Sequence, residues 1–137
     1  MPPSIQDIYA DVRKNFIYTP DVEQFKLLED WRSHANEIAQ PWRDDCDGFA
    51  LTCAEVAVLR GIEPIRVSVV LCLTEVGQRK RFVLPYDHMV CLISGPVGNL
   101  ILDNRQRRAE QMDNLPYKWH QAMNLAERGV WRLVKGD

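Results

Sequence analysis

Three residues of the types that cooperate in thiol chemistry occur in the chain order Cys46, His88, Asp103. A helix N-terminus stabilises a thiolate because its unpaired N–H groups carry partial positive charge. Cys46 has that position, since the acidic pair Asp44-Asp45 supplies an N-cap for the apolar residues that follow. A nucleophilic cysteine also needs a base, and the base needs a group that orients it. The three residues therefore predict attack on amide bonds through a cysteine thiolate.

A hairpin is expected to bring the base and its orienting group together. Residues 94–99 contain the Gly and Pro of a turn between two apolar strands. A turn centred between Gly95 and Pro96 places His88 directly opposite Asp103, and directly opposed side chains have Cβ atoms roughly 4.5–5.5 Å apart. At that distance a carboxylate can hold an imidazole N–H and fix its tautomer. A slip of one residue would move His88 to the other face of the sheet.

Each of these residues, taken alone, also has an ordinary structural interpretation. Cys46 fits a packing residue in a first helical turn, His88 a strand histidine bonded to a carbonyl, and Asp103 an Asx turn. Their order and placement together favour the catalytic interpretation. The other two histidines, His34 and His120, lie in polar, helix-like surroundings and are interpreted as surface residues.

The first half of the chain has apolar residues at helical spacing. Helices are expected at about residues 5–16 behind an N-cap at Ser4, at about residues 25–36, and from Cys46 onward, with Gly61 as the left-handed residue after the last helix.

The second half changes to β-branched and apolar residues, which favour strands. Residues 110–128 are instead compatible with a helix interrupted at Pro116. The expected strands, in an antiparallel meander with one further strand at the end, are residues 65–74, 80–84, 88–93, 100–103 and 130–134. These elements predict a single α+β domain over residues 1–137, with N-terminal helices packed on a small antiparallel sheet.

The composition excludes several classes of function. Apolar residues make up 46% and charged residues 26% of the chain, as in ordinary globular proteins. The net charge is −2 and the basic residues are dispersed, so no nucleic-acid footprint is expected. The longest apolar run, residues 65–73, is too short to cross a membrane, and no export signal is evident, so the cytoplasm is the expected compartment. The four cysteines form no CxxC pair, which argues against both a zinc site and a disulfide scaffold.

Three short blocks resemble the transglutaminase-like superfamily, and most closely the bacterial transglutaminase-like cysteine proteinases. Residues 45–50 (Asp-Cys-Asp-Gly-Phe-Ala) are similar to the nucleophile block of that family, Asp-Cys-Glu-Asp-aromatic-Ala. Residues 88–90 resemble its His block and residues 102–104 its Leu-Asp-Asn block, in the same order. The similarity covers roughly residues 42–104. It implies a papain-like or transglutaminase-like fold in a bacterial or phage protein.

The resemblance implies a cysteine peptidase or amidase acting on protein or peptide substrates, with Cys46 as nucleophile, His88 as base and then acid, and Asp103 as orienting group. Acyl transfer to an amine on the same triad is one alternative, and a catalytically inactive binding or scaffold domain of this fold is another. A metal-binding module is a third.

The resemblance also implies calcium for some members, held here by Asp45 and Asp47, although Gly48 stands where the family has a second acidic residue. The same two carboxylates fit an acidic N-cap equally well. Gln40, six residues before the cysteine as in papain-like enzymes, is a candidate oxyanion donor. Trp42 is a candidate for the substrate pocket or for the core.

Overall fold

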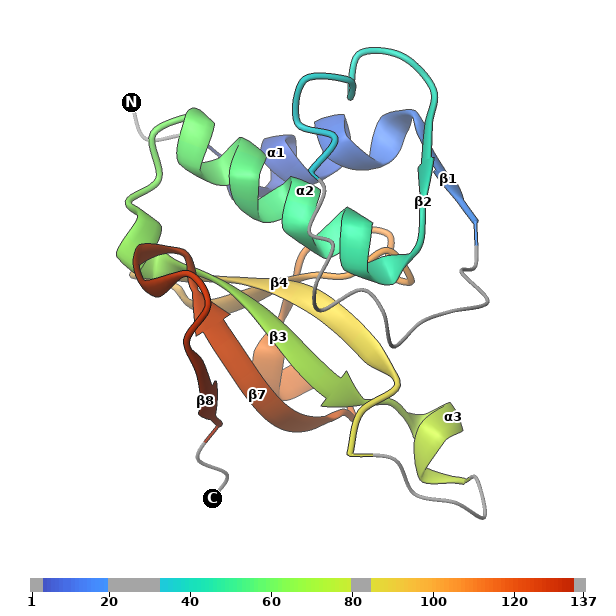
Figure 1. Ribbon diagram of the computed structural model, residues 1–137, viewed down its shortest axis with the longest axis vertical. Coiled ribbons are helices and arrows are strands. Elements are labelled where there is room, and N and C mark those ends of the chain that lie inside the picture. Colours follow the sequence, from blue (N-terminus) through green and yellow to red (C-terminus); the bar gives the residue numbers. More distant parts are fainter. Residues whose placement is uncertain (1–3, 20–32, 80–84, 135–137) are drawn as a thin grey trace.

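A helical layer covers one face of an antiparallel sheet in the computed structural model, which describes residues 4–19, 33–79 and 85–134 (Figure 1). The two longer helices, α1 (Ile5–Lys14) and α2 (Cys46–Leu59), lie together on this face. The α+β architecture expected from the sequence is confirmed. None of the helices in the described ranges has the length and apolarity needed to cross a membrane.

Both helices begin at the predicted N-caps. The Ser4 side chain accepts the N–H of Asp7 at the start of α1, and Asp45 accepts two N–H groups at the start of α2. Gly61 follows the end of α2 with φ of 103°, the left-handed conformation in which a side chain is disfavoured. Cys46 is therefore the first residue of α2, as predicted.

A two-stranded parallel sheet leads into α2. It pairs β1 (Phe16–Tyr18) with β2 (Trp42–Asp44). The helix expected at residues 25–36 lies largely outside the described residues, but its expected end is wrong because residues 33–40 form turns and coil. The strand expected at residues 80–84 also lies outside them.

The main sheet has the strand order β6-β5-β4-β3-β7-β8, with every neighbouring pair antiparallel. Its strands are β3 (Val67–Leu73), β4 (His88–Gly95), β5 (Gly98–Leu102), β6 (Glu110–Gln111), β7 (Lys118–Asn124) and β8 (Trp131–Leu133). A short helix α3 (Glu75–Gln78) and the 3-10 turns η2 (Pro64–Arg66), η3 (Met112–Asn114) and η4 (Leu125–Glu127) complete the described elements. The expected strands at residues 65–74, 88–93 and 100–103 and the final strand are confirmed, and the first of them pairs directly with the second.

The β4–β5 hairpin corrects the predicted register. Gly95 pairs with Gly98, so the turn is centred between Pro96 and Val97, one residue later than expected. Continuing this register sets Asp103 level with Val90, two residues from His88. A shift of two residues keeps side chains on the same face, so the two predicted partners remain diagonal neighbours.

Residues 110–128 are not helical, which corrects the sequence interpretation. They form β6, η3, β7 and η4, and β7 pairs with the central strand β3. A short helix interrupted at Pro116 would be only marginally stable, whereas pairing with β3 stabilises β7 as a strand. Leu71 pairs with Gln121 but the next residue, Cys72, pairs with Trp119, so His120 is an extra residue in a β-bulge.

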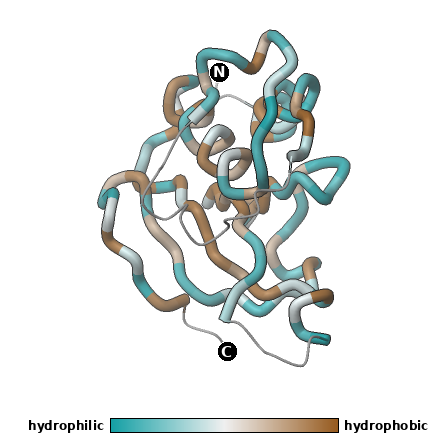
Figure 2. Tube along the Cα trace, turned by 45° about the vertical axis from the view of Figure 1, so that its right-hand side comes forward, coloured by the Kyte–Doolittle hydropathy of each residue, from teal (hydrophilic) through white to brown (hydrophobic). Residues whose placement is uncertain are grey.

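The main core lies between the helices and the sheet, where hydrophobic stretches of the chain run through the middle of the molecule (Figure 2). A smaller cluster lies on the opposite face of the sheet, around Val70, Cys72, Val90 and Ile101. Cys53, Cys72 and Cys91 are buried and free, as expected of small hydrophobic residues. The α2–β4 contact inside the main core positions the residues described next.

Candidate active site

Cys46 lies at the start of α2 with its thiol partly shielded from solvent. The thiol donates to Asp47 Oδ1 at 3.5 Å. Burial raises the pKa of Cys46, and the Asp47 carboxylate raises it further, whereas a hydrogen bond from the Met89 backbone lowers it. The direction is opposite to that expected from a helix N-terminus alone, so thiolate chemistry at Cys46 calls for a base that takes the thiol proton.

His88 is the first residue of β4, and its side chain is fully buried. Its Nε2 lies 2.7 Å from Asp103 Oδ1. Its Nδ1 is also buried and has no hydrogen-bond partner among the described residues. Buried polar atoms are normally paired, so an unpaired one calls for an explanation. A role in proton transfer with a reacting group is such an explanation for Nδ1.

Asp103 follows β5 and is also fully buried. Oδ1 accepts from His88 and, at 3.0 Å, from the N–H of Arg105, while Oδ2 accepts the Tyr117 hydroxyl at 2.6 Å. Burial by itself raises the pKa of Asp103, but the His88 hydrogen bond and charge, with those two donors, outweigh it and leave the pKa lowered. The group facing His88 is therefore a carboxylate.

The packing of α2 on β4 brings the thiol to the beginning of that strand. The Met89 backbone that hydrogen-bonds to Cys46 belongs to the residue directly after His88. The structure therefore brings His88 and Asp103 into direct contact and places Cys46 against the backbone of the residue that follows His88.

The comparisons with known proteins identify the family and the fold. A model of the family "bacterial transglutaminase-like cysteine proteinase" matches residues 3–137. The chain belongs to this family. No curated protein sequence gives a significant match.

Solved structures of LapG from Legionella pneumophila have a fold similar to that of this chain. One is 21% identical with a TM-score of 0.69, covering 97% of this chain and 68% of that chain. The EGTA-treated form is 20% identical, with coverages of 96% and 66%, and the calcium-bound form is 18% identical, with coverages of 97% and 70%; both have a TM-score of 0.69. The chain thus spans about two thirds of the length of those proteins.

Two tyrosines at the site were missed by sequence reasoning. Tyr117 bonds to the Asp103 side chain, and the hydroxyl of Tyr9 in α1 bonds to the backbone carbonyls of Asp103 and Gln106. Tyr9 had only the signal of a core residue at helical spacing. Tyr117 lay in the segment interpreted as helix-compatible, so nothing linked it to Asp103.

The candidate oxyanion donor and pocket residue have different surroundings. Gln40 is exposed, and its backbone N–H bonds to Glu37 O just before β2. Trp42 is only 3% exposed and packs in the core against Phe16 and Phe49, 4.7 and 6.2 Å between ring centroids. Of the two roles considered for Trp42, these contacts support packing in the core.

The carboxylates beside Cys46 take part in helix capping and in a contact with the thiol. Asp45 Oδ1 accepts the N–H groups of Asp47 and Gly48, both at 3.1 Å, as a helix cap. Calcium takes six to eight oxygen ligands, and no group of three or more His, Cys, Asp or Glu suited to a metal occurs within residues 4–19, 33–79 and 85–134. The acidic N-cap is the role that the geometry supports.

A carboxylate from β2 occupies the place next to Gly48. A Cβ atom added at Gly48 would lie 1.9 Å from Asp44 Oδ2, which is bonded to His34 Nε2 at 2.8 Å. His34 also stacks on Trp42, with centroids 5.0 Å apart, and is thus more than the surface residue expected. The acidic side chain that the family has at position 48 would not fit here without moving Asp44.

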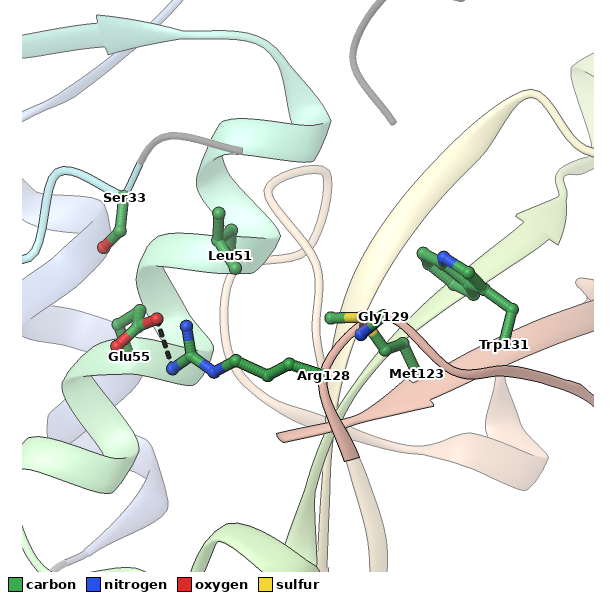
Figure 3. A pocket seen from close by; sticks show the side chains of 7 residues that line it. All are labelled: Ser33, Leu51, Glu55, Met123, Arg128, Gly129 and Trp131. Atoms are coloured by element: carbon green, nitrogen blue, oxygen red, sulfur yellow. Dashed lines mark hydrogen bonds and ion pairs between the residues drawn. The ribbon is translucent and has the colours of Figure 1, made fainter. Parts of the chain in front are cut away.

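A separate pocket of about 530 Å³ opens between α2 and the β7–β8 strands (Figure 3). Leu51, Met123 and Trp131 give it an apolar wall, and Arg128 forms an ion pair with Glu55 at 2.5 Å on its border. Its described lining includes none of the three candidate catalytic residues, so it is distinct from the site above.

Proposed function

We propose that this proteinase-family member cleaves amide bonds of protein or peptide substrates with Cys46 as nucleophile, His88 as general base and acid, and Asp103 as orienting carboxylate. The observation that carries the proposal is the buried His88–Asp103 pair at 2.7 Å, in which Nδ1 is the imidazole nitrogen without a partner in the described part of the chain. An imidazole fixed through one nitrogen presents the other for proton transfer.

The cycle begins when His88 Nδ1 takes the proton of the Cys46 thiol. The resulting thiolate sulfur adds to the substrate carbonyl carbon, and the imidazolium then gives its proton to the departing amine as the C–N bond breaks. Asp103 stabilises the imidazolium that exists between these two transfers. The product of this half-reaction is a thioester between Cys46 and the acyl part of the substrate.

The developing oxyanion needs hydrogen-bond donors. The Asp45 carboxylate takes the N–H groups of Asp47 and Gly48 and not that of Cys46, so the Cys46 N–H is a suitable first donor. We assign the second donor to the side-chain amide of Gln40, which is exposed just before β2. A Gln40→Ala variant that keeps full turnover would remove this assignment.

Water or an amine completes the cycle. Attack by water hydrolyses the thioester, whereas attack by an amine makes a new amide. Family membership favours hydrolysis. Mass spectrometry of products formed from a peptide mixture in ¹⁸O-water, with and without putrescine, separates the two: hydrolysis labels the new carboxylate, and acyl transfer adds the mass of the amine.

Alkylation of Cys46 by iodoacetamide, followed by mass spectrometry across a pH series, tests the proposed triad without a known substrate. The wild-type protein should be labelled at Cys46 near neutral pH. In His88→Ala, labelling should be confined to alkaline pH, because burial raises the pKa of Cys46 and no base remains. Identical profiles for the two proteins would instead favour an inactive binding domain of this fold.

We infer that calcium is not required by this chain, because the Asp45 carboxylate caps α2 and the Asp47 carboxylate contacts the Cys46 thiol. Thermal melting and Cys46 alkylation should be the same in millimolar calcium and in EGTA. A calcium-dependent rise in melting temperature would overturn this inference.

A further inference from the structure

Tyr117 contacts the candidate triad from an element outside the nucleophile, base and acid blocks. Its hydroxyl donates to Asp103 Oδ2 at 2.6 Å, and its ring meets the His88 imidazole edge-on, with centroids 6.0 Å apart and an interplanar angle of 85°. It thus touches both members of the buried pair.

The β-bulge at His120 explains how Tyr117 reaches this place. Beyond the bulge, Gln121 pairs with Leu71 and points to the helical face of the sheet, as Met123 does. Strict alternation would put Trp119 on that face too, but the extra residue turns it to the face of Cys72. Tyr117, two residues earlier, shares this face, and Cys72 pairs with His88 across β3–β4.

Other contacts hold the tyrosine in one orientation. Its ring packs edge-on against Trp119, with centroids 5.6 Å apart, and the Gln106 amide lies 3.5 Å from its hydroxyl. Burial raises the pKa of Tyr117, and its bond to Asp103 raises it further, so the hydroxyl stays protonated and donates. Asp103 has no freedom to rotate while Oδ1 is held by His88 and Oδ2 by Tyr117.

We propose that Tyr117 is a positioning residue of the active site, acting through Asp103 to fix the His88 imidazole and to keep the carboxylate charged. The proposal rests on the proposed function, since a positioning role requires that His88 serve Cys46. Hydrogen bonds to charged groups are among the strongest in proteins, so the removal of this one should be measurable.

The test compares the pH profile of Cys46 alkylation by iodoacetamide in wild type, Tyr117→Phe and Tyr86→Phe. Tyr86 is a matched control because its ring stacks on His120, away from Asp103. Tyr117→Phe should lower the alkylation rate near neutral pH by about tenfold or more. Its acid limb should move to higher pH, because Asp103 loses a donor that lowers its pKa. Tyr86→Phe should match the wild type in both respects.

A second variant keeps the test decisive if Tyr117→Phe folds poorly. Placing 3-fluorotyrosine at position 117 retains the hydroxyl, makes it a stronger donor, and should move the acid limb to lower pH. Opposite shifts for the two variants support the positioning role, whereas an acid limb that neither variant moves overturns it. Dependence of labelling on His88 but not on position 117 would overturn this inference alone, and independence of His88 would overturn the proposed function.

Discussion

His88 Nε2 and Asp103 Oδ1 lie 2.7 Å apart in a fully buried pair that joins the first residue of β4 to the residue after β5. A buried pair of this kind ties stability to pH because the pKa of Asp103 is lower in the folded state than in the unfolded state. The same contact therefore gives predictions for folding as well as for chemistry.

The acid stability of the protein should depend on Asp103. Its pKa is lowered in the folded state, so the stabilisation is present above the ordinary aspartate pKa of about 4 and is lost as pH falls through the folded value. Chemical denaturation from about pH 6 downward should show the unfolding free energy falling more steeply in wild type than in Asp103→Asn. Equal slopes would contradict the lowered pKa. At pH 7 the variant should be less stable by about 1–3 kcal/mol, since an amide cannot accept all three bonds.

Replacement of Cys46 should separate chemistry from packing. Cys46→Ala should abolish alkylation-sensitive turnover yet change the unfolding free energy by no more than about 0.5 kcal/mol, because the thiol lies at the edge of the core. Cys53→Ala is the matched control, since it removes a thiol seven residues further along α2. Cys53 is fully buried, so its loss should cost about 1 kcal/mol and leave turnover intact. A larger loss of stability for Cys46→Ala than for Cys53→Ala would mark Cys46 as a core residue.

The sequence predicted the parts of the site that depend on local patterns. A cap residue, helical spacing and a left-handed glycine locate α2, and with it Cys46. The predicted contact between His88 and Asp103 is present although the predicted register is wrong. The register differs by two residues, and an even shift leaves both side chains on the same face of the sheet. An error of one residue would have separated them.

The rest of the site depends on tertiary pairing that no local pattern encodes. In β7 the bulge at His120 breaks the alternation of period two, so Trp119 and Ala122 face the same side although one is odd and one is even in number. A strand interrupted in this way has a pattern that is also compatible with a helix. The sequence therefore provided no reason to place Tyr117 on the sheet beside Asp103. The spacing of Tyr9 predicted a core position in a helix. Its hydroxyl also donates to the carbonyls of Asp103 and Gln106, which lie about a hundred residues further along the chain, so no local pattern could reveal these bonds.

The cap of the nucleophile helix should matter more than that of α1. Asp45 is 2% exposed and accepts two N–H groups, whereas Ser4 is exposed and accepts one at 3.3 Å. Asp45→Ala should lower the unfolding free energy by about 1–2 kcal/mol, and Ser4→Ala by about 0.5 kcal/mol. Urea denaturation of both variants measures the difference. Equal losses would show that neither the burial of Asp45 nor its second hydrogen bond adds to the stability of the cap.

The contact between Gly48 and Asp44 should appear as a change of sign in a double-mutant cycle. In the wild-type background, Gly48→Ala forces the Asp44 carboxylate to move, which breaks its bonds to His34 Nε2 and to the Asp45 N–H, at 2.8 and 2.7 Å. The substitution should then cost about 1–3 kcal/mol. In an Asp44→Ala background the space is free, and Gly48→Ala should stabilise α2 by about 0.5–1 kcal/mol, the usual gain of Ala over Gly within a helix.

Gly61→Ala is the control for this cycle because Gly61 has positive φ and nothing within 4 Å of the added Cβ. Its cost comes from the backbone alone, so it should be the same with and without Asp44. The same unfavourable effect of Gly48→Ala in both backgrounds would show that Asp44 does not occupy the place beside Gly48. A reversal confined to Gly48 would establish that the Asp44 carboxylate from β2 occupies the space beside Gly48.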